Sequence, residues 1–188
     1  MVVGFTVDID DLKKYFKLNN VETSLTDDEL NSFCMYKINE LEMELGVTIT
    51  PKNHTEFIPR LDYDDKFLLD YYPVLSVNEV LIDGEKLESE DYILSSDDGI
   101  IYLKHNYYGN IRVDYTSGFN QTEFNNYIKT LIYDMLIYSQ DNNSLNNVTS
   151  MSEGDTSINY DTSSLLSTRI NNKINHLRNS FNVRAIML

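Results

Sequence analysis

Residues 69–119 read LDYYPVLSVNEVLIDGEKLESEDYILSSDDGIIYLKHNYYGNIRVDYTSGF and decide the fold of this chain. Apolar and polar residues alternate along the stretch, and turn signals interrupt the alternation. These signals are Asp83-Gly84, Asp97-Asp98-Gly99 and Tyr107–Asn110. Asp or Asn followed by Gly supplies the positive φ that tight hairpin turns need. The pattern therefore predicts an antiparallel β-meander with one buried face. The predicted strands are 77–82, 91–94, 100–104 and 111–116.

Helix-forming sequence lies on both sides of the meander. Asp8 caps the first predicted helix, and the capping box Thr26-Asp27-Asp28-Glu29 opens a second helix that Gly46 ends. Apolar residues at helical spacing predict two more helices after Gly118. The four expected helices are 9–18, 26–45, 122–140 and 165–181. Between the last two, residues 141–147 indicate a loop and residues 150–164 a short strand or an extended arm.

These elements predict an α+β fold, in which a bundle of about four helices carries an inserted antiparallel β-meander module. Residues 1–50 and 120–188 form the expected helical body, and residues 51–119 form the module. The connection at 47–63 is expected to be extended, because Pro51 and Pro59 both argue against a helix. Phe57 and Ile58 are candidates for an edge strand there.

The chain is strongly acidic, and its charged residues are unevenly distributed along the sequence. Thirty acids and 15 bases give a formal net charge of −15. No acid follows Asp161, and the bases Arg169, Lys173, Arg178 and Arg184 give the remaining segment +4, so residues 1–161 carry −19. An acidic surface disfavours binding of nucleic acid through phosphates. The basic segment is either the solvated face of one helix or a docking surface for an acidic partner, including another copy of this chain.

Cysteine usage and the N-terminus favour a soluble chain that is made in a cytoplasm. Cys34 is the only cysteine and lies on an apolar helical face, which favours a core residue over a nucleophile. The opening MVVGFTVDIDD has no basic segment followed by a long apolar run. No stretch approaches the roughly 20 apolar residues that span a bilayer.

A search for catalytic motifs favours a chain that is not an enzyme and holds no metal or cofactor. None of the acidic clusters Asp8/Asp10/Asp11, Asp62/Asp64/Asp65 and Asp97/Asp98 matches a calcium loop, because the first lacks the Gly and the others lack the spacing. Capping or turn formation explains the first and third. His54, His105 and His176 are far apart in sequence and form no HExxH motif. The chain also lacks GxSxG and a phosphate-binding glycine loop.

Tyrosines concentrate in and beside the meander. An aromatic ring with a polar tip suits both half-buried strands and protein interfaces. Single-stranded nucleic acid also stacks on aromatic rings, although such sites need interleaved bases, which are few here. Core packing and protein contacts are therefore the favoured roles.

In the order of its parts, the chain resembles the head-tail connector (adaptor or head completion) proteins of long-tailed bacteriophages and related archaeal viruses. The resemblance covers nearly the whole chain. The segments that carry it are DIDDLKKYFKL (8–18), TDDELNSFCMYKINELEMELG (26–46), DYYPVLSVNEVLIDGEKL (70–87), EDYILSSDDGIIYL (90–103), GNIRVDYTSGF (109–119) and GDTSINYD (154–161). The C-terminus departs from the family, whose members often end soon after a short basic Tyr-Arg segment, whereas NVRAIML follows Phe181 here.

The resemblance implies a structural protein of the virion neck, assembled in the host cytoplasm. It implies a ring, typically of twelve subunits, that docks below the portal, extends the DNA channel and carries a stopper or tail-completion protein. Double-stranded DNA would pass through without specific binding, and no membrane is involved. The candidate portal-docking residues are Arg169, Lys173, Arg178, Arg184, Ile186 and Leu188. The candidate residues for contacts between subunits or with tail-side proteins are Tyr72, Tyr92, Tyr102, Tyr107 and Tyr108.

Two other classes of function are open at this point. One is a cytoplasmic protein-protein interaction module, and the other, a more distant one, is a small-molecule hydrolase with scattered catalytic groups.

Overall fold

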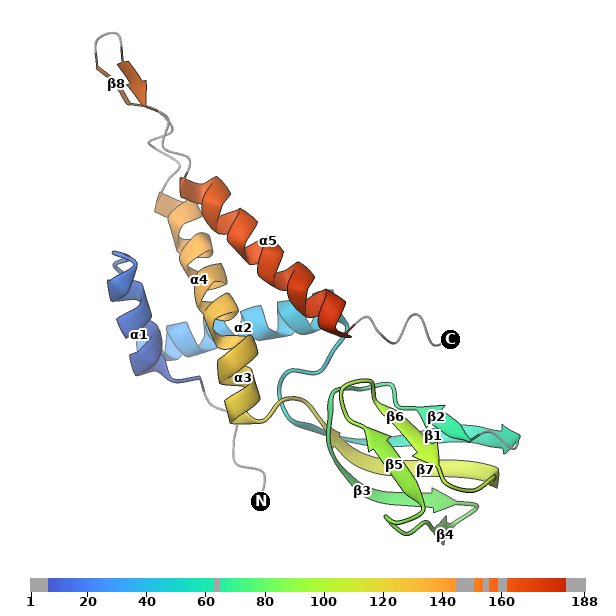
Figure 1. Cartoon of the computed structure of the whole chain (residues 1–188). Helices are drawn as coiled ribbons and strands as arrows, with labels where there is room; N and C mark the ends of the chain where they lie inside the picture. The colour runs from blue at the N-terminus through green and yellow to red at the C-terminus, as the bar shows by residue number, and fades with distance from the viewer. Residues whose placement is uncertain (1–6, 63–64, 145–150, 154–155, 159–161, 182–188) are drawn as a thin grey trace. The chain divides into compact units, whose positions relative to one another are not determined.

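The computed structural model describes residues 7–62, 65–144, 151–153, 156–158 and 162–181, which form an α+β fold (Figure 1). This confirms the predicted class. The chain divides into two compact units. The β unit comprises Glu42–Phe124 with residues 180 and 181, and the helical unit comprises the described residues between 7 and 41 and between 125 and 179.

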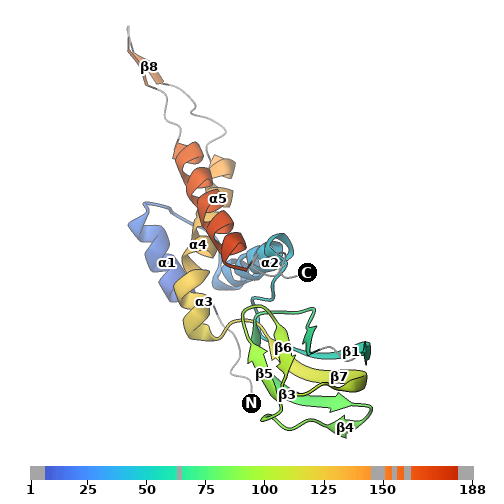
Figure 2. The same cartoon turned by 45° about the vertical axis from the view of Figure 1, so that its right-hand side comes forward.

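The helical unit is built from four helices. These are α1 (Ile9–Leu18), α2 (Asp27–Leu45), α4 (Lys129–Ser144) and α5 (Thr162–Phe181), of which α4 is the central one. Helices α4 and α5 lie side by side, α1 packs against α4, and α2 crosses behind α4 (Figures 1 and 2). Every residue of α4 from Leu131 to Ile137 is buried, so α4 is covered on all sides along these two turns.

The helix N-termini form as the capping signals predict. In α1, Asp8 Oδ1 accepts a hydrogen bond from the backbone N–H of Asp11 at 3.0 Å. In α2, the backbone N–H of Thr26 donates to Glu29 Oε2 at 2.8 Å, and the N–H of Glu29 donates to Thr26 Oγ1 at 3.4 Å. Both arrangements satisfy N–H groups that a helix leaves without an internal partner. Cys34 is fully buried in α2, as predicted.

The long helix predicted for 122–140 is two helices in the structure. Helix α3 (Gln121–Tyr127) and α4 are separated by a turn at Ile128. Asn120 caps α3, because its Oδ1 accepts from the N–H groups of Thr122 and Glu123 at 3.0 Å. Helix α4 also continues to Ser144, so the predicted loop begins too early.

The β unit holds two antiparallel sheets. One has the order β1 (Lys52–Asp62), β7 (Tyr108–Ser117), β3 (Val74–Ile82) and β4 (Glu85–Lys86). The other has the order β2 (Lys66–Leu68), β6 (Ile100–Leu103) and β5 (Tyr92–Ser95). The predicted edge strand at 57–58 is confirmed and is the centre of a longer strand, β1, at the edge of the first sheet.

The strand order differs from a meander. The hairpin turns at Asp83-Gly84 and at 96–99 form as predicted. The predicted turn at Tyr107–Asn110 is wrong, because β7 begins at Tyr108 and pairs with β1 and β3 in place of β6. Glycine is needed at position 109 because the Asp83 side chain lies close to the backbone there: a Cβ at this residue would lie 2.5 Å from Asp83 Oδ2.

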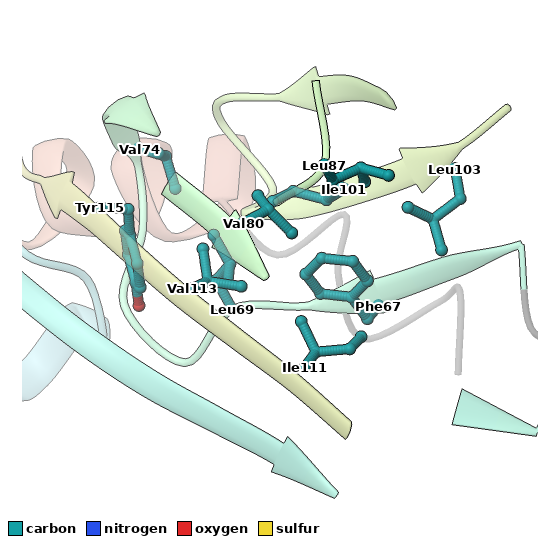
Figure 3. Close-up of a cluster of buried hydrophobic side chains, with 10 residues drawn as sticks. All are labelled: Phe67, Leu69, Val74, Val80, Leu87, Ile101, Leu103, Ile111, Val113 and Tyr115. Carbon is teal, nitrogen blue, oxygen red and sulfur yellow. The ribbon is translucent and has the colours of Figure 1, made fainter. Parts of the chain in front are cut away.

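Apolar side chains from both sheets form the core of the β unit. Figure 3 shows the cluster, in which Phe67 and Ile101 from the second sheet gather with Val80 and Val113 from the first. The buried members are Phe67, Leu69, Val74, Val80, Leu87, Ile101, Leu103, Ile111, Val113 and Tyr115. The two sheets thus bury one face each against the other, which explains the alternation of the sequence.

The expected arm between α4 and α5 contains a two-stranded hairpin. Strand β8 (Met151–Glu153) pairs antiparallel with β9 (Thr156–Ile158), with Ser152 opposite Ser157. Helix α5 begins at Thr162, three residues before its predicted start.

Candidate interaction surfaces

Helix α5 carries three bases of the C-terminal segment, Arg169, Lys173 and Arg178, and two of them contact one buried carboxylate. Asp134, in the middle of α4, has no exposed surface. Arg169 Nη2 donates to its Oδ1, and Lys173 Nζ lies 2.8 Å from its Oδ2. The Lys173 ammonium also donates to Thr130 Oγ1 at 3.2 Å. The two bases are one helical turn apart, so both reach the same acid.

Helix α1 completes this cluster through Tyr15. The Tyr15 hydroxyl donates to Asp134 Oδ1 at 2.7 Å. Burial, together with this hydrogen bond, raises the pKa of Tyr15 to about 12, so the hydroxyl keeps its proton near neutral pH. A buried carboxylate is tolerated only where cations and hydrogen-bond donors surround it. We call Tyr15, Asp134, Arg169 and Lys173 the buried-acid cluster.

The buried-acid cluster gives two predicted docking residues a partner inside the chain. The side chains of Arg169 and Lys173 remain 47% and 35% exposed, so their outer surfaces border solvent while their charged ends bind Asp134. Arg178 Nη1 donates to Asn175 Oδ1 at 2.9 Å. Arg184, Ile186 and Leu188 lie outside the described residues. A docking role for these six residues stays a prediction.

A groove of about 600 Å³ lies next to the buried-acid cluster, between the α3–α4 turn and α5. Tyr127, Arg169, Lys173 and His176 line it. Tyr127 is 59% exposed. We call this surface the α5 groove.

A second concave surface, of about 430 Å³, lies between the segment before α2 and the C-terminal half of α4. Its apolar lining is Val21, Leu25, Phe33 and Leu136, and Glu22 is its charged residue. Phe33 is 43% exposed. We call this surface the α2 hollow.

The five predicted interface tyrosines have different environments. Tyr72, Tyr92 and Tyr107 are partly buried and pack against the core of the β unit, and Tyr102 is also partly buried. Burial raises the pKa of Tyr92. Tyr108 is half exposed and is the member of the set whose ring most clearly faces solvent. Sequence reasoning missed the exposed apolar side chains Phe57, Tyr71 and Ile93 of the same unit.

A polar network in the β unit explains why some tyrosines there are structural. The Tyr115 hydroxyl donates to Glu56 Oε1 and accepts from the backbone N–H of Tyr71 at 3.1 Å. Burial, then the bond to Glu56, raises the pKa of Tyr115. His54 stacks on Tyr71 with ring centroids 4.1 Å apart.

His54 with Ser117, and Cys34, belong to residue types that many enzymes use for catalysis, but here Ser117 and Cys34 are fully buried and His54 is partly buried. His54 Nε2 lies 2.8 Å from Ser117 Oγ, but Ser117 is fully buried, so its hydroxyl is not open to a substrate. Burial lowers the pKa of His54. Burial raises the pKa of the Cys34 thiol to about 12, which suppresses the reactive thiolate.

The described part of the chain holds neither a cluster of metal ligands nor a membrane-spanning helix. In this part no three His, Cys, Asp or Glu side chains gather closely enough to hold a metal ion. None of the helices described is long and apolar enough to cross a bilayer.

Comparisons with known proteins identify the fold. No protein-family model and no curated protein sequence matches this chain. A chain in the neck of an empty GTA particle, obtained with C6 symmetry, matches with a TM-score of 0.57 at 12% identity, over 90% of this chain and 91% of that chain. A chain in the virion of a native gene transfer agent (GTA) particle matches with a TM-score of 0.54 at 12% identity, over 90% and 91%.

A third match lies in the neck of a native GTA particle, obtained with C12 symmetry. Its TM-score is 0.51 at 11% identity, over 90% of this chain and 94% of that chain. The matches cover the helices and the sheets together. This chain therefore shares its fold with chains found in gene transfer agent particles and their necks.

Proposed function

We propose that this chain is a structural protein of a virion neck, a head-tail connector or adaptor. It forms a ring, of twelve subunits, below the portal, extends the DNA channel and provides the platform for a stopper or tail-completion protein. The observation that carries the proposal is the fold match to neck chains over 90% of this chain. A likeness confined to the β unit would carry less, because small antiparallel sandwiches occur in many unrelated proteins.

The charge of the chain supports a role around DNA without tight binding to it. A net charge of −15 repels phosphates over most of the surface. DNA passes such a wall without the phosphate contacts that hold a DNA-binding protein in place. The neck is therefore a conduit in this proposal, and the chain needs no cofactor, no metal and no membrane.

The C-terminal segment is the candidate portal-docking region. Arg169 and Lys173 bind Asp134 and line the α5 groove, so we assign portal docking mainly to Arg178 and to the residues after Phe181, which include Arg184, Ile186 and Leu188. On the tail side, Tyr108 is the best exposed of the candidate tyrosines.

Binding to the portal protein of the same virus tests the proposal. A chain that ends at Phe181 should fold as the full chain does, by circular dichroism and thermal unfolding, and should no longer copurify with the portal. Full-length protein should copurify. If the truncated chain binds as well as the full chain, the C-terminal docking assignment is wrong. If neither binds, the connector role itself loses its support.

A further inference from the structure

The α5 groove and the α2 hollow lie on two different sides of the central helix. On α4, Thr130 lines the α5 groove, and Asp134 binds the groove residues Arg169 and Lys173. Leu136 and Gln140 of the same helix line the α2 hollow. At 3.6 residues per turn these two pairs are about 120° apart round the helix axis. One subunit thus presents two separate concave surfaces within one compact unit.

The two surfaces carry charge of opposite sign. The α5 groove is lined by Arg169 and Lys173, whose two positive charges exceed the single negative charge of Asp134 beneath them. The α2 hollow has one charged lining residue, Glu22. Asp27, Asp28 and Glu29 follow at the start of α2 but do not line the hollow, and Lys13 and Lys17 line an adjoining hollow together with Glu22. Of these acids, Asp27 pairs with Lys13. The lining of the hollow is therefore negative, through Glu22, and the lining of the groove is positive, through Arg169 and Lys173.

Each surface also exposes one large aromatic ring. Tyr127 stands in the α5 groove and Phe33 in the α2 hollow. Exposed aromatic side chains in concave, partly apolar surfaces are the usual anchors of protein interfaces. Burying two rings would supply apolar area, while the opposite charges would fix the orientation of the partner.

We propose that the α5 groove of one copy of this chain binds the α2 hollow of the next copy, with Arg169 and Lys173 facing Glu22. This inference rests on the proposed ring and names the contact between its subunits. A closed ring is built from a heterologous contact, in which each subunit uses two different and complementary surfaces. Opposite charge on the two surfaces favours this pairing and penalises a contact of either surface with itself.

Cross-linking between two introduced cysteines tests the contact. Asn172→Cys places a thiol in the α5 groove, and Ser24→Cys places one in the α2 hollow; both positions are exposed or line these surfaces. Cys34 is fully buried and stays unreactive. A short bismaleimide should convert the double variant into a ladder of covalent multimers. Each single variant should stay monomeric, and a mixture of the two single variants should give dimers and nothing larger.

A matched control uses Asn39→Cys on the exposed side of α2, outside both surfaces, in place of Ser24→Cys. Its combination with Asn172→Cys should give no ladder.

The mass of the uncross-linked complex is measured in parallel, for the protein alone and with its portal. A ring without a cross-linked ladder would overturn the proposed contact and leave the connector role standing. Dimers from one single variant would show that a surface binds itself and would also overturn it. The absence of any oligomer would overturn both proposals.

Discussion

The ammonium of Lys173 on α5 lies 2.8 Å from Oδ2 of Asp134, a carboxylate on α4 that has no exposed surface. Arg169 binds the other carboxylate oxygen, and Tyr15 donates a further hydrogen bond from α1. One buried charge therefore joins three helices. The bases of the C-terminal segment consequently have a structural role in the helical unit, whatever else they bind.

Removing both cations should destabilise the helical unit strongly. In the variant Arg169→Met with Lys173→Met, Asp134 stays buried with Tyr15 as its remaining donor. We expect the free energy of unfolding, measured by urea denaturation, to fall by about 3 kcal/mol, since an unpaired buried charge costs about 3–5 kcal/mol. Lys173→Met alone should cost about 1 kcal/mol, because Arg169 still neutralises the acid.

A third substitution separates charge from packing. Adding Asp134→Leu to the double variant removes the buried charge, and most of the lost stability should return. Arg178→Met, on the same helix, is the matched control and should change stability by less than about 0.5 kcal/mol. A triple variant no more stable than the double variant would contradict this account of the cluster.

Acid should weaken the β unit through Glu42. Burial opposes ionisation of this carboxyl, but the Lys52 ammonium at 2.7 Å and the N–H groups of Ile49 and Thr50 outweigh burial and hold its pKa below 4.5. A pKa that is lower in the folded chain contributes stability above the unfolded value, and that stability is lost as the pH falls through the folded value.

The variant Glu42→Gln isolates this contribution. At pH 7 it should unfold at lower urea concentration than the parent, by about 1–2 kcal/mol. The difference between the two proteins should shrink as the pH falls below 4.5. A difference that stays constant down to pH 3 would mean that Glu42 acts through its shape and not through its charge.

Substitution of Tyr92 should lower the stability of the fold, whereas substitution of Tyr108 should not. Tyr92 packs against the core of the β unit, so Tyr92→Ala should lower the free energy of unfolding by about 2–3 kcal/mol. Tyr108 is half exposed, so Tyr108→Ala should change stability by less than about 0.5 kcal/mol. If Tyr108 contacts a tail-side partner or another subunit, sedimentation velocity should show weaker association for Tyr108→Ala alone. Equal losses of stability for the two variants would contradict these environments.

Gly118 should tolerate no side chain. Its φ is +120°, and a Cβ would lie 2.9 Å from the Cα of Pro51. We expect Gly118→Ala to cost about 2 kcal/mol or more, since backbone strain and a clash add. Gly84, with φ of +87° and open space around it, is the matched control and should cost about 1 kcal/mol. The melting temperatures of the two variants are compared by thermal unfolding. Equal melting temperatures would show that the contact with Pro51 adds no cost to the substitution at Gly118.

Local chemistry explains which parts of the fold were predictable from the sequence. Asp8, the Thr26–Glu29 capping box and the Asp83-Gly84 turn each act over a few residues, and each formed as predicted. The pairing of β3 with β7 joins residues far apart in the chain, and turn signals carry no information about it. Gly109 looked like a turn residue because a positive φ and a close backbone approach both call for glycine.

The buried-acid cluster was missed although one signal for it was present. Asp134 interrupts the apolar run Leu131–Ile137, and an acid on the buried side of a helix needs a cation from another element. Arg169 and Lys173 were interpreted as a solvated helix face or as docking residues, so their pairing with Asp134 was not predicted. The two surface hollows arise only from packing between helices, so the order of residues did not reveal them.

The mass of the native complex, for the purified chain alone and mixed with the portal protein of the same virus, tests the central claim most directly. The account predicts a discrete oligomer with the mass of a twelve-subunit ring, either alone or on the portal. A chain that remains a strict monomer and ignores the portal at every protein concentration and ionic strength would contradict it.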